Sequence, residues 1–367
     1  MTDKPGQADD IAMKGGGYYS LATIGAKDVI NAATPLVLDA VARMDLAGSR
    51  GFTMSDMGCA DGGTSIEMVG AVLKGLRTRY PDLPLSVVYT DQPRNDYNAL
   101  FQIIHGMTGI ESYREGIDNL FVSASATSFY RRILPPESLN LGFSATAMHW
   151  LSEKPGDIST HVHMVGADGA ERAAFAAQGR RDWEAILLHR AAELVPGGRL
   201  VFANFCRDEA GRYLGHTGGI SMFDTFNRIW VAFLDEGAIT DDEYVAMTLP
   251  QYYRDVDEFA APLQDSDSAV HQAGLRLEHI ETRVTPCPYA VDFRDHGDTA
   301  RFARSYIPTL RSWTESTFYG GLSSDRPAEE RRAIIDRYYD TYEAMVREAP
   351  DGHAMDYVHA FMTIRKL

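Results

Sequence analysis

A glycine-rich turn follows an acidic residue in the segment 56–64, which reads DMGCADGGT. Glycine lets the backbone bend sharply and approach a ligand closely, so a turn of this kind between a strand and a helix is typical of a nucleotide site. The spacing is not G-x-G-x-x-G, and Asp56 would repel a pyrophosphate. An acidic residue there favours a ligand with an ammonium group, such as the amino acid end of S-adenosylmethionine. The alternative is an ordinary glycine turn.

A second acidic residue, Asp91, follows a run of apolar residues at 85–89. A carboxylate at the end of a second strand can accept hydrogen bonds from both ribose hydroxyls of an adenosine. The polar residues Asn95, Asp96 and Asn98 indicate a loop, although the two asparagines could instead cap a helix. Together with the segment 56–64, Asp91 predicts a site for S-adenosylmethionine.

His149 and Trp150 are adjacent hydrogen-bond donors after a short apolar run at 139–143. An imidazole and an indole N–H can both bind carboxylate oxygens. Adjacent donors on a loop after a strand could clamp such a group. The alternative is a buried Trp beside a surface His.

Two further features suggest chemistry that we do not expect. His161 and His163 have the spacing of two metal ligands, but His-x-His alone is a weak signal, so we predict no metal site. Cys59 lies beside the glycines and is interpreted as a small packing residue. The three cysteines, Cys59, Cys206 and Cys287, have neither a disulfide pattern nor a zinc spacing.

The candidate residues need a scaffold that brings strand ends together, and the hydrophobic pattern predicts one. Apolar runs indicate strands at 51–56, 85–89, 120–123, 139–143 and 200–205, and helices at 26–44, from about 64 to 76, at 95–105 and at 170–194. Pro35 should kink or restart the first helix. The segment 196–198 (PGG) should stop the last one. This alternation predicts an α/β fold with a parallel, doubly wound sheet.

The alternation breaks after residue 206, where aromatic and acidic residues replace the strand pattern. We predict an arm and the main core at 1–206, a first cap segment at 207–270, a return to the sheet at 271–290, a second cap segment at 291–350 and a final core strand at 351–367. In the cap, Phe223 and Trp230 are candidate pocket walls. Their helical spacing is equally typical of a helix core.

Composition narrows the class of protein. The chain has 367 residues, of which 45% are hydrophobic and 23% charged, as in ordinary globular proteins. Its formal charge of −16 disfavours nucleic acid and anionic membranes as partners. Residues 1–10 lack an apolar signal core and no run is long enough to span a bilayer, so we expect a cytoplasmic protein. The abundance of Ala, Arg, Asp and Gly favours a bacterial source.

Several blocks, taken in order, resemble the SABATH family, the methyltransferases for salicylate, benzoate, jasmonate and theobromine-type substrates. The similar blocks are 13–16 (MKGG), 56–59 (DMGC), 91–98 (DQPRNDYN), 128–135 (SFYRRILP), Ser144 with 149–152 (HWLS), 196–198 (PGG), and Pro250 with Tyr252. The similarity runs from about residue 13 to residue 290 and is weaker beyond.

The resemblance implies a Rossmann-like class I methyltransferase sheet with a helical cap, commonly as a homodimer. It implies cofactor contacts from Lys14, Asp56, Asp91, Gln92, Ser128 and Phe129, to which we add Gly58 and Ser144. It places a small carboxylic acid near His149 and Trp150, which we therefore predict to be catalytic residues that clamp its carboxylate. Methyl transfer to a carboxylate needs alignment and a dry pocket rather than a base, because a carboxyl group with a pKa near ~4 is already ionised at neutral pH. We expect the same pocket to be lined by Lys14, Thr146, Phe223 and Trp230.

The opening segment departs from the family pattern. The pairs at 20–21 (SL), 24–25 (IG) and 27–28 (KD) stand where the family usually has Ser-Tyr, Asn-Ser and a Gln. A Gln that commonly touches the acceptor carboxylate is therefore missing or replaced. Thr146 stands where an aromatic residue is common. We expect the pocket to suit a different acid from the plant substrates.

Three alternatives remain open from the sequence. The same fold could methylate a phenol or a ring nitrogen, in which case His149 would serve as a base. A nicotinamide-dependent oxidoreductase would need the G-x-G-x-x-G spacing that is absent. A catalytically dead cofactor-binding or scaffold protein would not need Asp56, Asp91, His149 and Trp150 together.

Overall fold

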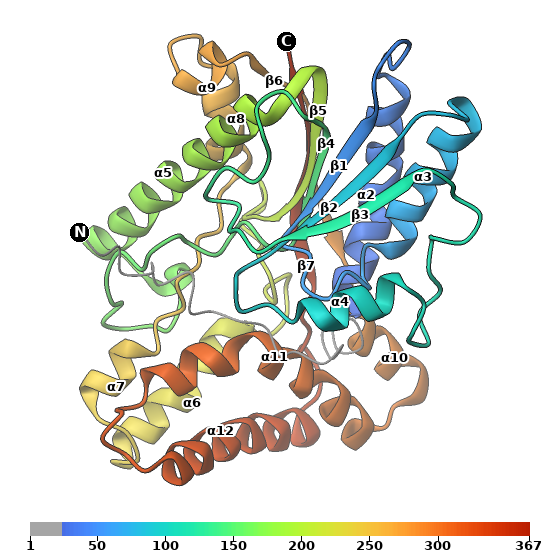
Figure 1. Cartoon of the computed structure of the whole chain (residues 1–367). Coiled ribbons are helices and arrows are strands. Elements are labelled where there is room, and N and C mark those ends of the chain that lie inside the picture. Colours follow the sequence, from blue (N-terminus) through green and yellow to red (C-terminus); the bar gives the residue numbers. More distant parts are fainter. Residues whose placement is uncertain (1–23) are drawn as a thin grey trace.

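The computed structural model describes residues 24–367, so the expected arm and Lys14 lie outside the described residues. The described chain contains a seven-stranded sheet in the order β3-β2-β1-β4-β5-β7-β6. Helices cover both faces of this sheet, and a group of helices lies across one of its edges (Figure 1). None of the helices within residues 24–367 is long and apolar enough to cross a membrane.

The elements follow the predicted alternation. The strands are β1 (Phe52–Met57), β2 (Leu85–Thr90), β3 (Leu120–Ser125), β4 (Leu139–Ala145), β5 (Leu194–Phe205), β6 (Leu275–Thr285) and β7 (Tyr357–Lys366). The first helices are α2 (Ile24–Ala42), α3 (Ile66–Arg79), α4 (Tyr97–Ile104), the short η2 (Met164–Gly166) and α5 (Gly169–Glu193). The later helices are α6 (Met222–Asp235), α7 (Asp241–Ala246), α8 (Val256–Gln264), α9 (Ala269–Gln272), α10 (Pro288–His296), α11 (Thr299–Gly321) and α12 (Ala328–Glu348).

The register brings the predicted loops to one edge of the sheet. Strand β1 pairs in parallel with β2 and β4, so Asp56 lies opposite Tyr89 on one side and Phe143 on the other. Strands β3 and β5 extend the same parallel arrangement. Because parallel strands end at the same edge, the segments after β1, β2, β3, β4 and β5 all meet there.

The predicted parallel arrangement holds for β1 to β5, whereas the last strand, β7, runs antiparallel to both β5 and β6. The reason lies in the connection, because α12 ends among the helices at the carboxyl edge and the next strand must start from that edge (Figure 1). The first residues of β7, Tyr357 and His359, therefore lie beside the end of β5, with His359 opposite Phe205.

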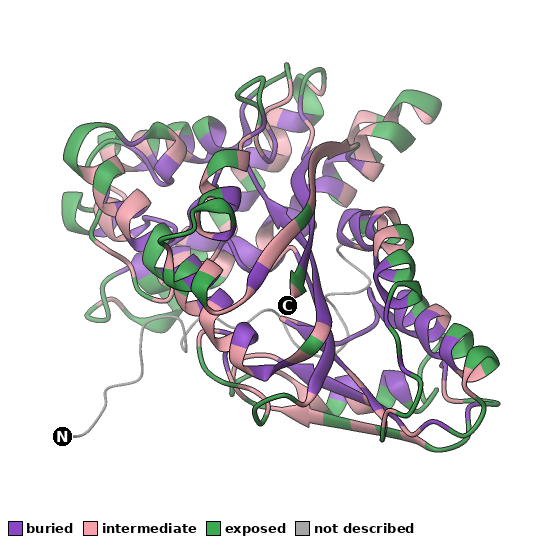
Figure 2. Cartoon of the chain, turned by 90° about the horizontal axis from the view of Figure 1, so that it is seen from above, coloured by how far each residue is buried: buried purple, intermediate pink, exposed green. Residues whose placement is uncertain are grey.

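Two layers of helices bury the two faces of the sheet. Helices α2 and α3 cover one face, where Val37 and Val69 are fully buried with Phe143 of β4. On the other face, Trp183 of α5 packs edge-on against Phe202 of β5 and Phe259 of α8. Viewed from above, buried strands lie between helices whose outer sides are exposed (Figure 2).

Helices α6, α7, α10, α11 and α12 lie over the carboxyl edge of the sheet, and we call this group the cap (Figure 1). The cap has an aromatic core, in which Trp230 stacks on Tyr338 at 4.3 Å and meets Phe318 edge-on. Helices α8 and α9 fall within the segment 207–270 that the sequence analysis assigned to the cap, but they pack against β6 and α5.

Two predicted helix boundaries differ from the structure. Helix α2 continues through Pro35 to Ala42, so the proline does not restart it. Helix α5 ends at Glu193, before the segment 196–198, which lies inside β5 rather than in a loop. The reason is that Leu194 already pairs with Leu139, and the PGG segment forms an irregularity in the β4–β5 ladder.

Candidate active site

The turn after β1 bends through three left-handed residues, Gly58 (φ +80°), Ala60 (φ +48°) and Gly62 (φ +72°). A Cβ atom at Gly58 would lie 2.5 Å from the Cβ of Ala147, and one at Gly62 would lie 2.5 Å from Cδ1 of Leu100. Gly58 therefore requires glycine for both space and backbone angle, and Gly62 requires it for its backbone angle. Ala60 holds the same kind of angle with a side chain, which costs conformational energy.

The loop after β2 fixes this strained turn. The Asp91 carboxylate accepts hydrogen bonds from the Ala60 and Gln92 amides, both at 2.7 Å, and Asn95 Nδ2 donates to the Ala60 carbonyl at 2.7 Å. Both sides of Ala60 are thus held by the second loop. The capping role considered for Asn95 falls instead to Asp96, whose side chain accepts from the Ala99 amide.

The two acidic residues predicted to bind cofactor sit in a poorly solvated environment. Asp56 is 4% exposed and accepts a hydrogen bond from the Ser65 hydroxyl at 2.5 Å. Burial raises the pKa of Asp56 to about 7, the Ser65 hydrogen bond opposes this, and the charge of Asp91 adds to it. Burial also raises the pKa of Asp91, against the effect of its two amide donors. Within residues 24–367, no basic side chain pairs with Asp56.

The structure brings most of the other predicted cofactor residues around these loops. The Phe129 ring comes within 3.8 Å of the Cβ position of Gly58, and the Ser128 hydroxyl accepts from the Tyr130 amide at 3.4 Å. Gln92 Oε1 is buried without a partner among the described residues. Ser144 is fully buried, and its hydroxyl donates to the Met57 carbonyl at 2.7 Å, so it joins β4 to the end of β1.

His149 and Trp150 follow β4 and lie at the same edge of the sheet. The His149 ring lies 4.8 Å edge-on from Phe205 and 5.5 Å from Trp150, measured between centroids. Burial lowers the pKa of His149 well below its usual range, and His359 and Arg254 lower it further. His149 is therefore a neutral imidazole with one N–H to donate.

The backbone around His149 is held by the segment that follows α7. The Tyr252 amide donates to the His149 carbonyl at 2.8 Å, and Arg254 Nη1 donates to the Met148 carbonyl at 3.1 Å. Thr146, a predicted pocket residue, has φ +56° and donates its amide to the Ala203 carbonyl at 2.9 Å. A strained residue tied to the next strand thus begins the turn that carries His149.

The two predicted cap residues occupy different places. Phe223 of α6 stacks on His163 at 3.8 Å and lies 6.0 Å from Tyr253, so it faces the sheet edge. Trp230, about two turns further along, is fully buried and makes its ring contacts within the cap. The structure therefore brings Phe223, but not Trp230, to the aromatic group around His149.

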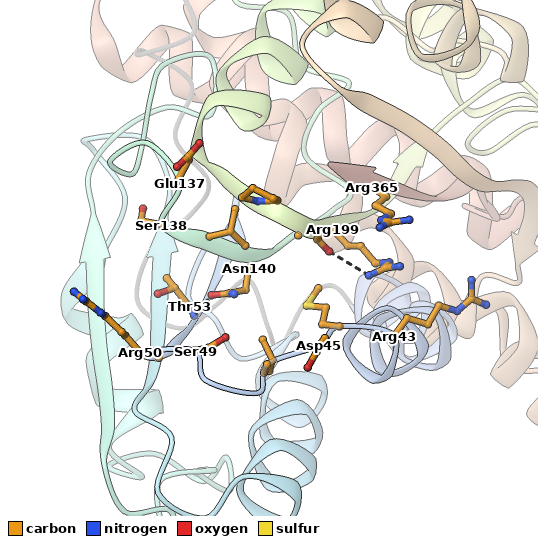
Figure 3. A pocket seen from close by; sticks show the side chains of 17 residues that line it. Arg43, Asp45, Ser49, Arg50, Thr53, Glu137, Ser138, Asn140, Arg199 and Arg365 are labelled. Atoms are coloured by element: carbon orange, nitrogen blue, oxygen red, sulfur yellow. Dashed lines mark hydrogen bonds between the residues drawn. The ribbon is translucent and has the colours of Figure 1, made fainter. Parts of the chain in front are cut away.

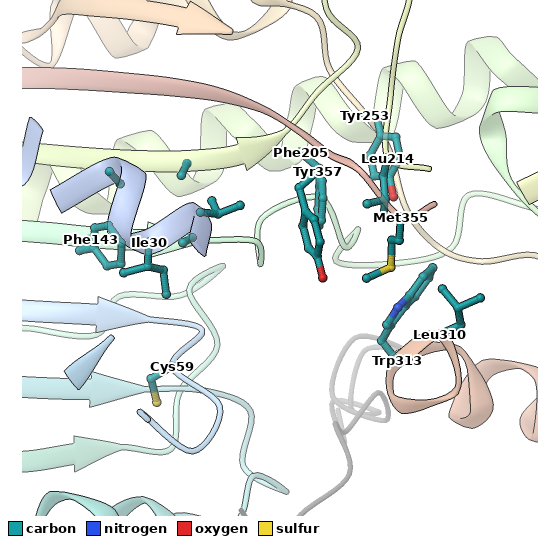
Figure 4. Packing of buried hydrophobic residues seen from close by; sticks show 14 of the residues in the cluster. Ile30, Cys59, Phe143, Phe205, Leu214, Tyr253, Leu310, Trp313, Met355 and Tyr357 are labelled. Carbon is teal, nitrogen blue, oxygen red and sulfur yellow. The ribbon is translucent and has the colours of Figure 1, made fainter. Parts of the chain in front are cut away.

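Sequence reasoning missed the residues that complete this group. Phe205, Tyr253, Tyr357 and His359 come from β5, the segment after α7, and β7. Figure 4 shows Phe205, Tyr253 and Tyr357 near the strand ends, with Trp313 of α11 across from them. No motif marks these residues, since only the antiparallel return of β7 brings residues 357–359 beside residue 205.

The histidine pair considered for a metal has other contacts. His161 Nδ1 lies 2.9 Å from the His163 carbonyl, and its Nε2 lies 3.3 Å from Asp224. His163 stacks on Phe223. Among residues 24–367, no group of three His, Cys, Asp or Glu side chains is arranged to hold a metal ion.

A cavity of about 620 Å³ lies at the opposite, amino edge of the sheet (Figure 3). Its wall includes Arg43, Arg199 and Arg365, but Arg199 is paired with Glu278 at 2.9 Å and Arg43 is paired with Asp39 at 2.8 Å. None of the predicted site residues in the described chain lines it. The candidate active site is therefore the carboxyl edge beneath the cap.

A Rossmann-like sheet with this pair of loops at its carboxyl edge defines a class I methyltransferase fold. The solved structure of a loganic acid methyltransferase with SAH has the same fold, with a TM-score of 0.76 at 20% identity over 96% of this chain and 98% of that one. A family model described as SAM dependent carboxyl methyltransferase matches residues 10–367. The chain belongs to this family.

Relatives with known names agree with this assignment. A loganic acid O-methyltransferase of Catharanthus roseus is 26% identical over 70% of this chain and 72% of its own length. Indole-3-acetate O-methyltransferase 1 of Arabidopsis thaliana is 25% identical over 82% of this chain and 83% of its own length. The family resemblance seen in the sequence is confirmed, as are the methyltransferase fold, the S-adenosylmethionine cofactor and the carboxyl methyltransferase activity. The oxidoreductase and scaffold hypotheses are set aside.

Proposed function

We propose that a small organic acid is converted to its methyl ester at the carboxyl edge of the sheet. In this proposal the cofactor binds to the glycine-rich turn after β1 and to the Asp91 loop after β2, and the acid binds between His149 and the cap. The observation that carries this assignment is Asp56, a buried carboxyl group with no basic partner within residues 24–367. Such a group fits the ammonium of S-adenosylmethionine, because a bound cation would offset the burial that raises its pKa.

The neighbouring residues fit the rest of the cofactor. S-adenosylmethionine supplies an electrophilic methyl group on a sulfonium. Asp91 keeps unused acceptor capacity on its carboxylate for ribose hydroxyls, and Gln92 offers an unpaired buried oxygen. Gly58 leaves room where a side chain would collide. We retain Ser128, Phe129 and, through its support of β1, Ser144 in the cofactor site.

His149 and Trp150 are proposed to orient the acid rather than to move its proton. Because a carboxylate with a pKa near ~4 is ionised at neutral pH, the reaction needs alignment and exclusion of water. A neutral His149 donates one hydrogen bond, and the Trp150 indole can donate another. Burial makes His149 a weak base, which disfavours the alternative of methylating a phenol with a pKa near ~10.

The product decides between these alternatives. The full chain is incubated with labelled S-adenosylmethionine and a panel of aromatic, aliphatic and terpenoid acids. We expect a methyl ester, which mild alkali converts to methanol and the free acid. An alkali-stable methylated product would overturn the carboxyl assignment and support a phenol or ring nitrogen as acceptor.

We further propose that the cap closes over the acid. The supporting observation is that Phe223 and Trp313 face the sheet edge from two cap helices. Hydrogen exchange should show added protection in α6 and α11 when S-adenosylhomocysteine and an acid are both bound. Unchanged exchange in both helices would contradict closure.

A bacterial source, a cytoplasmic location and a homodimer complete the proposal. The composition supports the first, the cysteine usage supports the second, and the family resemblance supports the third. Light scattering on the purified chain would test the dimer, since a monomeric mass at micromolar concentration would contradict it.

A further inference from the structure

Two buried imidazoles flank Phe205 at the carboxyl edge of the sheet, and each keeps a ring nitrogen without a hydrogen-bonding partner among the described residues. They are His149, at Nδ1, and His359, which has at least one unpaired ring nitrogen beside its hydrogen bond to the Tyr357 backbone. His359 is fully buried, with its ring 4.1 Å from Phe205, and His149 meets the same ring edge-on at 4.8 Å. Buried polar atoms are nearly always paired in native proteins, so this concentration points to a ligand that pairs them.

The two histidines are neutral in this environment. Burial lowers the pKa of His359 to about 3, and a hydrogen bond to the Tyr357 backbone offsets only part of that effect. The pKa of His149 is also lowered, by burial first and then by His359. A neutral imidazole offers one donor and one acceptor. An imidazole N–H can donate to a hydroxyl or carbonyl oxygen, and its other nitrogen can accept from a hydroxyl. An uncharged group fits beside these neutral buried rings better than a second carboxylate, because burying an unpaired charge costs much more.

The surfaces beside these atoms are aromatic. Tyr253 lies 5.7 Å from Phe205, Tyr357 stacks on Phe205 at 5.9 Å, and Trp313 stands across from them on α11 (Figure 4). Aromatic walls bury flat apolar surface well. The site thus combines ring-sized apolar walls with polar atoms that are separate from the Trp150 indole.

We propose that the acceptor is a ring-bearing carboxylic acid with at least one hydroxyl or carbonyl group besides its carboxylate, and that His359 determines this specificity by hydrogen-bonding that group. The inference rests on the proposed function of this edge as the acceptor site. The proposed function concerns the carboxylate that is methylated, whereas this inference concerns the rest of the acid. A merely structural His359 would make no difference to which acid is preferred.

The test uses pairs of acids that differ only by a hydroxyl, namely benzoate, cinnamate and cyclohexanecarboxylate with their ring-hydroxylated counterparts. Affinity is measured by calorimetry on the full chain with S-adenosylhomocysteine present, and kcat/KM with labelled S-adenosylmethionine. We expect at least one hydroxylated acid to be preferred over its partner by roughly 10- to 100-fold, the scale of leaving a buried polar group unpaired.

Variants separate specificity from folding. His359→Phe keeps a ring but removes both nitrogens, so the preference should fall to within about threefold while the unsubstituted acid binds no worse. His359→Gln keeps a donor and an acceptor and should retain most of the preference. The matched control is His353→Phe, at a buried histidine with an unpaired Nδ1 whose ring contact is Tyr342 in the cap. This control should leave the preference unchanged.

The outcomes distinguish this inference from the proposed function. Equal methylation of both members of every pair would overturn the inference and leave the proposed function standing. A hydroxyl preference in binding without any alkali-labile product would support the polar pocket and overturn the proposed function. If no acid of the panel binds, or if His359→Phe keeps the preference, the inference is overturned, because it commits the pocket to ring-bearing acids and the specificity to His359.

Discussion

The cofactor half and the acceptor half of the site are built in opposite ways. In the cofactor half, two nearby segments bond to each other, with Asp91 and Asn95 holding both sides of Ala60. In the acceptor half, His149, Phe205 and His359 come from three distant segments, and ring nitrogens of both histidines lack partners within residues 24–367. The backbone of the first half is held by hydrogen bonds between its two loops, whereas the second is assembled from side chains that leave ring nitrogens unpaired.

This difference corresponds to what each half binds. One cofactor serves the whole family, so the loops that bind it can be rigid, with their backbone hydrogen bonds formed before the cofactor arrives. This reduces the entropy cost of ordering them on binding. The acid differs between relatives that are named for loganic acid and for indole-3-acetate. A pocket assembled from side chains on separate elements can change one residue without disturbing the cofactor loops. We therefore expect substitutions in the first half to have large effects on cofactor binding and those in the second to change acid selection.

The largest effect is expected from Gly58→Ala. The new Cβ would lie 2.5 Å from the Cβ of Ala147 at φ +80°, so overpacking and backbone strain act together. We expect a loss of about 2–5 kcal/mol in the free energy of unfolding and a fall of more than about 100-fold in S-adenosylmethionine affinity. Denaturant unfolding and calorimetry measure both. Gly48→Ala is the control, because Gly48 has φ +75° but no atom within 4 Å of the added Cβ. Backbone strain alone should therefore lower its free energy of unfolding.

Asp91→Ala should have the next largest effect. It removes the acceptor for the Ala60 and Gln92 amides and the proposed ribose contact. We expect S-adenosylmethionine binding to weaken by about 1–3 kcal/mol, or roughly 5- to 150-fold. Asp45→Ala removes a comparable carboxylate–amide bond, to Ala47, at an exposed position and should leave affinity unchanged. Equal calorimetric affinity in folded Asp91→Ala and native protein would contradict the ribose assignment.

Asp56 should make cofactor binding depend on pH. Its folded pKa is about 7, and an ammonium group binds the ionised form, so affinity should fall by about tenfold per pH unit below 7 and level off above it. The folded pKa lies above the unfolded value of 3.8, so the carboxyl group disfavours the folded state increasingly as pH rises from 4 to 7. Asp56→Asn should therefore flatten the dependence of unfolding free energy on pH in that window while weakening cofactor binding. Calorimetry that finds pH-independent affinity between pH 6 and 8 would contradict this.

The smallest effect is expected from His149→Gln in the acceptor half. Glutamine keeps a hydrogen-bond donor but cannot act as a base. If His149 only orients a carboxylate, KM should rise several-fold while kcat stays within about tenfold of the native value. A loss of about 10²–10⁴ in kcat would instead identify His149 as a base and contradict ester formation. His216→Gln, at a histidine whose ring contact is Tyr213, is the matched control for a general effect on folding.

The sequence determined the cofactor half because its chemistry is local. Asp56 ends one predicted strand, and the glycines and Asp91 lie just beyond predicted strands. Parallel strands must end at one edge, so the meeting of these residues was predictable without a structure. Tertiary structure determined the acceptor half. Cap packing placed Phe223 at the site and Trp230 in the cap interior, although both stand on one face of α6. The reversed direction of β7 placed His359 opposite Phe205, since its chain enters from the cap, and no local pattern in residues 357–366 encodes that direction.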